Sequence, residues 1–149
     1  MRKTNPIRWK CDRGSSLVEF SLVGFMFIIV LFGVVEMGRM ILVYTTLSNA
    51  AHAGTRYAIV HGADQTVSPM GPGDPCTCTQ IQTVVKNYAS AGLLDVNNLT
   101  VTVSYPNGSN IAGSPVSVTA SYTYDPLVGY FSAMLSTTMG STSQGVITY

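Results

Sequence analysis

The chain has 149 residues, which is enough for one compact domain after a membrane-spanning segment is subtracted. Its formal net charge is +1 and only 10% of its residues are charged, so its overall charge favours neither nucleic acid nor an acidic substrate as a ligand. Five of the eight basic residues nevertheless precede residue 14: Arg2, Lys3, Arg8, Lys10 and Arg13. A phosphate-binding arm is one interpretation of this cluster, but no aromatic stacking platform or recognition helix accompanies it. The cluster is better interpreted as the cytoplasmic flank of a membrane helix.

The first predicted element is a transmembrane helix. Residues 17–35 read LVEFSLVGFMFIIVLFGVV and contain one ionisable side chain, Glu19, so they are long and apolar enough to cross a bilayer. The excess of positive charge before this run predicts a cytoplasmic N-terminus. We therefore expect a basic leader over residues 1–14, a transmembrane helix over 15–36 and an extracytoplasmic remainder.

A secretory signal peptide is an alternative, because Ala51-His52-Ala53 has the small-x-small pattern of a cleavage site. The apolar run is longer than a signal peptide requires, and Glu36 and Arg39 separate it from that triplet. A plain membrane anchor without further function is the other simple interpretation.

The helix is expected to continue outside the membrane over residues 37–60. Apolar and small side chains recur there at spacings of three, four and seven, as on one face of a helix: Met37, Ile41, Tyr44, Leu47, Ala51 and Ala58. Residues 61–78 then hold three prolines, three glycines and two cysteines, which predicts a surface loop.

The remainder, residues 61–149, is expected to form a small extracytoplasmic α+β domain. Residues 79–92 have helical periodicity and end at Gly92, a helix C-cap residue type. Residues 99–104 and 116–122 alternate apolar with small polar side chains, which predicts two antiparallel strands joined by a turn that begins at residues 105–108. We also expect a short helix over 127–135 and a last strand containing Val146, Thr148 and Tyr149. The predicted fold is a long helix leading into a pilin-like domain with about three antiparallel strands and one or two short helices.

The motif GSSLVEF, residues 14–20, lies between the basic leader and the apolar run. Its glycine, followed five residues later by a glutamate, resembles the processing site of type IV prepilins, and Glu19-Phe20 resembles the glutamate–aromatic pair of the tight-adherence branch. The segments EMGR, residues 36–39, and NAAHAGTRYA, residues 49–58, extend the resemblance to the TadE-like domain. The resemblance covers about a third of the chain.

This resemblance implies a minor pseudopilin of a tight-adherence (Flp) pilus system, held in the bacterial cytoplasmic membrane and associated with pilus assembly, secretion, adhesion and biofilm formation. A prepilin peptidase would cut between Gly14 and Ser15. The implied partners are that peptidase, other pilins and pseudopilins, the inner-membrane assembly platform and membrane lipid, with no nucleic acid. The alternative from another class is an uncleaved, membrane-tethered sensing or adhesion domain.

The charged residues of the helix have two further interpretations. A carboxylate within an apolar helix costs about 2.5–3.5 kcal/mol on insertion scales, so Glu19 is expected to need a cationic partner. In the resembled family that partner is the new N-terminal amine of a neighbouring subunit; alternatively, the Glu19 side chain reaches the membrane interface. Glu36 and Arg39 are three residues apart and are expected to form a pair at the membrane interface.

The cysteines follow the predicted topology, since Cys11 precedes the helix while Cys76 and Cys78 follow it and are candidates for oxidation. Cys-x-Cys does not have the spacing of common zinc sites, and no nucleophile elbow, phosphate loop or metalloprotease motif occurs. We therefore predict neither catalysis nor a metal or cofactor. The triplets that begin at Asn98 and Asn107 match a glycosylation pattern, but we interpret them as strand and turn residues.

Overall fold

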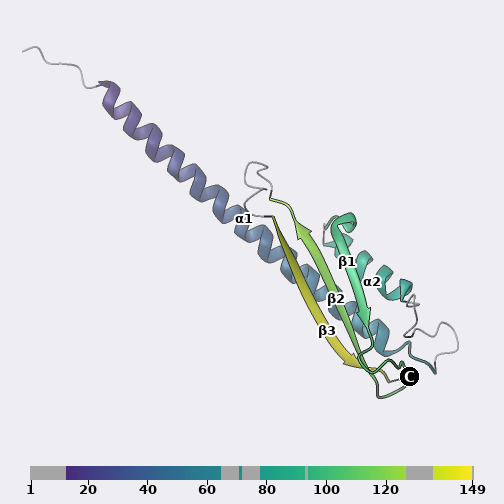
Figure 1. The fold of residues 1–149 in the computed structure, drawn as a ribbon. Helices are drawn as coiled ribbons and strands as arrows, with labels where there is room; N and C mark the ends of the chain where they lie inside the picture. Colours follow the sequence, from purple (N-terminus) through teal and green to yellow (C-terminus); the bar gives the residue numbers. More distant parts are fainter. Residues whose placement is uncertain (1–12, 65–70, 72–77, 93, 127–135, 149) are drawn as a thin grey trace, which may run out of the picture. The chain divides into compact units, whose positions relative to one another are not determined.

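The computed structural model describes residues 13–64, 71, 78–92, 94–126 and 136–148. Its elements are α1 (Arg13–Ile59), α2 (Thr79–Ala91), the 3-10 turn η1 (Val96–Asn98), β1 (Leu99–Ser104), β2 (Pro115–Tyr124) and β3 (Thr137–Val146). Figure 1 shows the long helix, the second helix and the three strands. The predicted α+β class is confirmed, with a second helix and a three-stranded antiparallel sheet packed against the long helix. The chain divides into two compact units, Met1–Met37 and Gly38–Tyr149.

In the first unit, the described part of α1 has an apolar surface on all sides. Every residue from 14 to 37 is exposed except Gly24 and Glu36, which are half-buried. Large side chains such as those of Phe20 and Phe25 remain 79% and 65% exposed. A surface of this kind requires lipid or other apolar helices around it, because water would have to solvate every side of the helix.

In the second unit, one face of α1 is buried beneath the domain. Its buried hydrophobic positions recur at spacings of one, three, four and seven: Val43, Leu47, Ala50, Ala51 and Ala58. The predicted stripe was right at Leu47, Ala51 and Ala58 but wrong further up the helix, where Met37, Ile41 and Tyr44 are more than half exposed. These three positions precede Leu47, the first fully buried residue of α1.

Helix α2 packs on this face through Ile81, Val85 and Ala89, which are fully buried at helical spacing. It ends as predicted at Gly92, whose amide donates to the carbonyl of Ala89 at 3.0 Å. The predicted helix over residues 79–92 is therefore confirmed. The short helix predicted over 127–135 lies outside the described residues.

The sheet has the order β1-β2-β3, and both pairs are antiparallel. The two strands expected from alternating side chains are confirmed, with Val101 opposite Ala120 in the register of β1 and β2. The turn after β1 is closed by the Gly108 amide, which donates to the Tyr105 carbonyl at 2.9 Å. Gly108 has a φ of 61°, which a glycine adopts without strain.

The third strand differs from the prediction. We expected a strand with Val146, Thr148 and Tyr149, but β3 runs from Thr137 to Val146 and Tyr149 lies outside the described residues. Most residues of β3 are Ser, Thr or Gly, so the strand lacks the alternation of large apolar side chains that marks the other two. Pairing with β2 along its whole length forms this strand.

Contacts with α1 also hold β3 in place. The Thr55 hydroxyl lies 3.2 Å from the Ser143 carbonyl oxygen and 3.0 Å from that of Ala51. Beyond the end of β3, the Thr148 amide donates to the Ile59 carbonyl at 3.0 Å. The contacts of Thr55 with Ser143 and of Thr148 with Ile59 join segments almost 90 residues apart in the sequence, so local sequence patterns do not reveal them.

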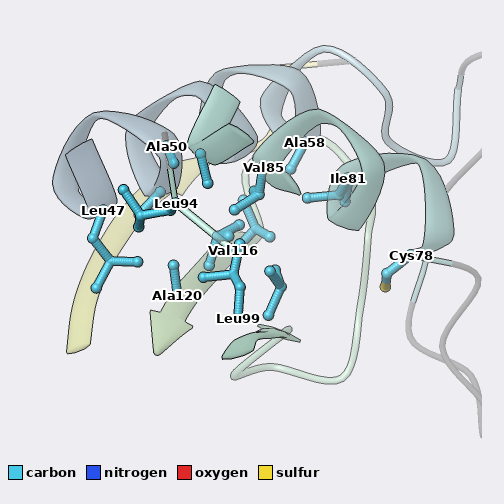
Figure 2. Packing of buried hydrophobic residues seen from close by; sticks show 14 of the residues in the cluster. Leu47, Ala50, Ala58, Cys78, Ile81, Val85, Leu94, Leu99, Val116 and Ala120 are labelled. Atoms are coloured by element: carbon cyan, nitrogen blue, oxygen red, sulfur yellow. The ribbon is translucent and has the colours of Figure 1, made fainter. Parts of the chain in front are cut away.

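Buried side chains from α1, α2, β1 and β2 converge in one core. Figure 2 shows Leu47 and Ala50 of α1, Ile81 and Val85 of α2, and Val116 of β2 pointing into the same space. Many of the remaining members are small, and the alanines that are fully buried among the described residues are Ala50, Ala51, Ala89 and Ala120. The small side chains allow the helices and the sheet to approach closely.

The closest such approach yields a stability prediction at Gly54. A Cβ added there would collide with Cγ2 of Val85 and lie 3.2 Å from Cγ1 of Val118. We expect Gly54→Ala to reduce the free energy of unfolding of this unit by about 1–3 kcal/mol, since the packed core must shift to admit a methyl group. Urea-dependent proteolysis of the detergent-solubilised full chain measures this change.

Gly38→Ala is the matched control for Gly54→Ala, because Gly38 lies in the same helix and has no atom within 4 Å of its added Cβ. Alanine favours a helix over glycine by about 1 kcal/mol, so this control should not be destabilised. Equal stability of the two variants would contradict the close packing at Gly54.

Candidate functional site

The predicted processing site lies at the start of α1. Gly14 and Ser15 are in its first turn, both are exposed, and an added Cβ on Gly14 would meet no atom within 4 Å. The first turn of an α-helix has backbone amides without helical partners, and helix ends fray. A peptidase at the membrane surface would therefore reach this backbone with few side chains in its way. Residues 1–12, including the rest of the leader, lie outside the described residues.

Glu19 lies on the exposed apolar part of α1, one turn beyond Ser15. Its side chain and that of Phe20 are both exposed. No described residue gives the Glu19 carboxylate a hydrogen bond or an ion pair. The nearby hydroxyl of Ser21 is satisfied within the helix, since it donates to the Val18 carbonyl at 2.8 Å. Glu19 is the one ionisable residue within residues 14–35, and its carboxylate needs a partner once the helix is in lipid.

Glu36 and Arg39 lie where the two units divide, and each is half-buried. The Arg39 guanidinium carbon is 5.3 Å from the centre of the Tyr124 ring, which is almost fully buried at the end of β2. Such a cation–π contact contributes about 0.5–1 kcal/mol at an exposed site. Arg39 therefore contacts the domain, a role that the sequence analysis missed. Its pairing with Glu36 at the membrane interface stays a prediction.

A polar groove opens on the second unit, lined by Asn49, His52, Ala53 and Arg56 of α1 and by Tyr88 of α2. The first four positions share one side of α1 because they are spaced by three and four residues. Arg56 and Tyr88 are exposed, while the Nδ1 atom of His52 lies 2.9 Å from the Ser143 hydroxyl. Together these side chains offer several hydrogen-bond donors and one fixed positive charge. The sequence analysis missed this groove, although the spacing of its α1 residues was visible.

Cys78 and His61 were possible metal ligands in the sequence, but each makes other contacts in the structure. Cys78 is buried beside the core and disulfide-bonded, while Cys76 lies outside the described residues, so the pairing of these two stays a prediction. The His61 ring stacks on Tyr57 with ring centres 4.0 Å apart. In the part of the chain that the structure describes, no group of three or more His, Cys, Asp or Glu side chains could hold a metal ion.

The helix also meets the physical requirements of a membrane anchor. It is the one described helix that is long and apolar enough to cross a bilayer, over Gly14–Ile59, and its most apolar stretch is not buried by the rest of the chain. It lies near the N-terminus and is consistent with a single membrane anchor.

The start of the chain is similar to a known protein family. Residues 14–56 match the family model described as TadE-like protein. The matched segment begins at the glycine of the predicted processing site and ends at Arg56 in the polar groove. No curated protein and no solved structure matches the chain. Residues 14–56 of this chain are thus similar to the TadE-like protein family.

Proposed function

We propose that this protein is a minor pseudopilin of a tight-adherence pilus system, made as a precursor and cut after Gly14 by a prepilin peptidase. One observation carries the proposal: the matched segment starts at Gly14 and continues into an exposed apolar stretch, residues 17–35, whose single carboxylate is Glu19. A cut after Gly14 creates a free amine at Ser15, four residues before that carboxylate. The mature protein would thus carry both charges needed to join neighbouring subunits.

The proposed orientation has the leader in the cytoplasm and Gly38–Tyr149 outside it. Two observations support this topology. The leader holds five basic residues, which the cytoplasmic side of a membrane helix favours. Cys78 is disulfide-bonded, and disulfides persist mainly in extracytoplasmic compartments.

In assembly, the Glu19 carboxylate would accept from the N-terminal amine of a neighbouring subunit within the membrane. Two opposite charges at hydrogen-bond distance attract far more strongly in a medium of low dielectric constant than in water. An unpaired carboxylate in the helix therefore favours association with a partner that carries the matching charge. The protein would support pilus biogenesis, and through it adhesion and biofilm formation, in contact with other pilins and the inner-membrane assembly platform.

N-terminal sequencing of the protein from the membrane fraction tests the proposed processing. Ser15 as the first residue is expected, because the cut falls between Gly14 and Ser15. An intact leader in the mature protein would instead support the uncleaved sensing or adhesion domain.

Replacing Gly14 by leucine should block cleavage, because a branched side chain would then stand at the cut. The precursor should still insert, since insertion depends on the apolar run and its basic flank. Gel mobility of the membrane fraction reports both results, and Gly24→Leu, within the same helix and away from the cut, is the control. Normal processing of Gly14→Leu would place the cleavage site elsewhere.

Replacing Glu19 by alanine should leave insertion and cleavage intact but reduce co-purification with pilus components. The change removes a charge that costs about 2.5–3.5 kcal/mol to insert, and with it the attraction to a neighbouring amine. Ser21→Ala is the matched control, because its hydroxyl is bonded within its own helix. Normal assembly of Glu19→Ala would mean that the carboxylate only reaches the membrane interface.

A further inference from the structure

The polar groove of the second unit holds side-chain groups that have no partner among the described residues. The Asn49 amide, the Arg56 guanidinium and the Tyr88 hydroxyl line it, and none of them makes a hydrogen bond or an ion pair within the part of the chain that the structure describes. A ligand with matching acceptors can therefore bind here without breaking a contact of the fold.

The charge of the groove is one-sided. Arg56 carries a permanent positive charge, and its planar guanidinium presents a fork of donors that matches the two oxygens of a carboxylate. No residue that lines the groove is acidic. An approaching carboxylate thus meets a complementary charge and no like charge, which favours an anionic ligand over a neutral or cationic one.

His52 adds a ring of fixed orientation to the groove. Its Nδ1 atom lies 2.9 Å from the hydroxyl of Ser143, a buried residue of β3. Because this bond uses Nδ1, the Nε2 atom is left to donate or accept a hydrogen bond. The Asn49 amide can both donate and accept. The groove therefore suits hydroxyl groups as well as a carboxylate.

Tyr88 supplies an apolar surface beside these polar groups. Its side chain is 53% exposed, and it reaches the groove from α2, whereas the other lining residues come from α1. An aromatic ring offers a flat apolar face, on which a sugar ring can stack its C–H groups. The groove has a volume of about 510 Å³, within the usual range of ligand pockets, and has room for a sugar unit.

We propose that the polar groove binds an acidic polysaccharide, through a uronic acid unit whose carboxylate pairs with Arg56 and whose ring lies against Tyr88. Asn49 and His52 hydrogen-bond the hydroxyls of the same unit. The inference rests on the proposed function in one respect, because an extracellular polymer reaches the groove only when Gly38–Tyr149 lies outside the cytoplasm. It gives the proposed adhesion a ligand class.

An acidic segment of another protein carries the same carboxylate but matches the groove less well. Extended peptides pair with an open strand edge, and helical peptides insert apolar side chains into a hydrophobic groove. The walls here are helices α1 and α2, whose backbone groups are bonded within each helix, and Ala53 and the Tyr88 ring are the apolar parts of the lining. A carbohydrate is polar throughout and matches this lining better.

Binding of two uronic acid polymers, polygalacturonate and alginate, to the detergent-solubilised full chain tests the proposal. At least one of them should bind when immobilised on a sensor at physiological salt, where attraction between distant exposed charges is screened. Its methyl ester should bind about tenfold more weakly, since esterification removes the charge and keeps the sugar.

Arg56→Gln should weaken binding of the acidic polymer about tenfold, because it removes a charge-assisted hydrogen bond. Lys86→Gln is the matched control, since it removes the same charge from an exposed position on α2 that does not line the groove. The basic leader is unchanged in both variants, so the difference between them reports on the groove alone.

Substitutions at Tyr88 distinguish a sugar from a simple anion. Tyr88→Ala should weaken binding severalfold, whereas Tyr88→Phe, which keeps the ring, should retain most of it. Polyglutamate, an acidic peptide with no sugar ring, should displace the polymer poorly at equal carboxylate concentration.

The proposal is overturned if the wild-type chain binds neither polymer, if the methyl ester binds as tightly as the acid, or if Arg56→Gln and Lys86→Gln bind alike. Loss of the Tyr88 ring without effect, or efficient displacement by polyglutamate, would instead make the groove a site for an acidic protein segment. This assay requires no pilus. Cleavage after Gly14 and recovery of pilus components report on the proposed function separately, so either idea can fail alone.

Discussion

A helix in hydrocarbon must be apolar on every side, whereas a helix beneath a small domain needs an apolar surface only where the domain packs. Helix α1 meets both requirements in one continuous element. Residues 14–37 expose apolar side chains all round, and from Val43 onward one face is buried while the other carries polar groups. The fold, the anchor and the candidate contact surfaces all follow from this change along the helix.

The domain itself is too small to rely on large side chains alone. Alanines and Gly54 occupy the buried face of α1, which lets α2 and the sheet approach closely enough for Val85 and Val118 to meet the helix backbone. A glycine also allows β3 to approach α1 closely, since a Cβ on Gly145 would lie 2.5 Å from Cδ1 of Ile59. Close packing of small residues, with a disulfide at Cys78, compensates for the limited apolar area of a small domain.

Helix α1 carries few charges, and after Gly14 they are Glu19, Glu36, Arg39 and Arg56. In lipid an unpaired charge is costly, so the few charges on α1 are the groups most able to decide which helix lies beside it and at what height. Arg39 shows a division of roles, since its guanidinium lies over Tyr124 of its own domain. Arg56 and Tyr88 of the polar groove, by contrast, are exposed to the solvent.

The sequence by itself determined the long apolar helix, helix 79–92, the first two strands and the family segment, because each has a local pattern of hydrophobicity or a compact motif. Tertiary structure decided which residues α1 buries, since full burial begins only at Leu47 and leaves Met37 and Tyr44 more than half exposed. It also decided the position of β3 and the polar groove. Both depend on contacts between distant segments, such as Ser143 with Thr55 or Tyr88 beside Arg56, and a local pattern carries no information about such pairings.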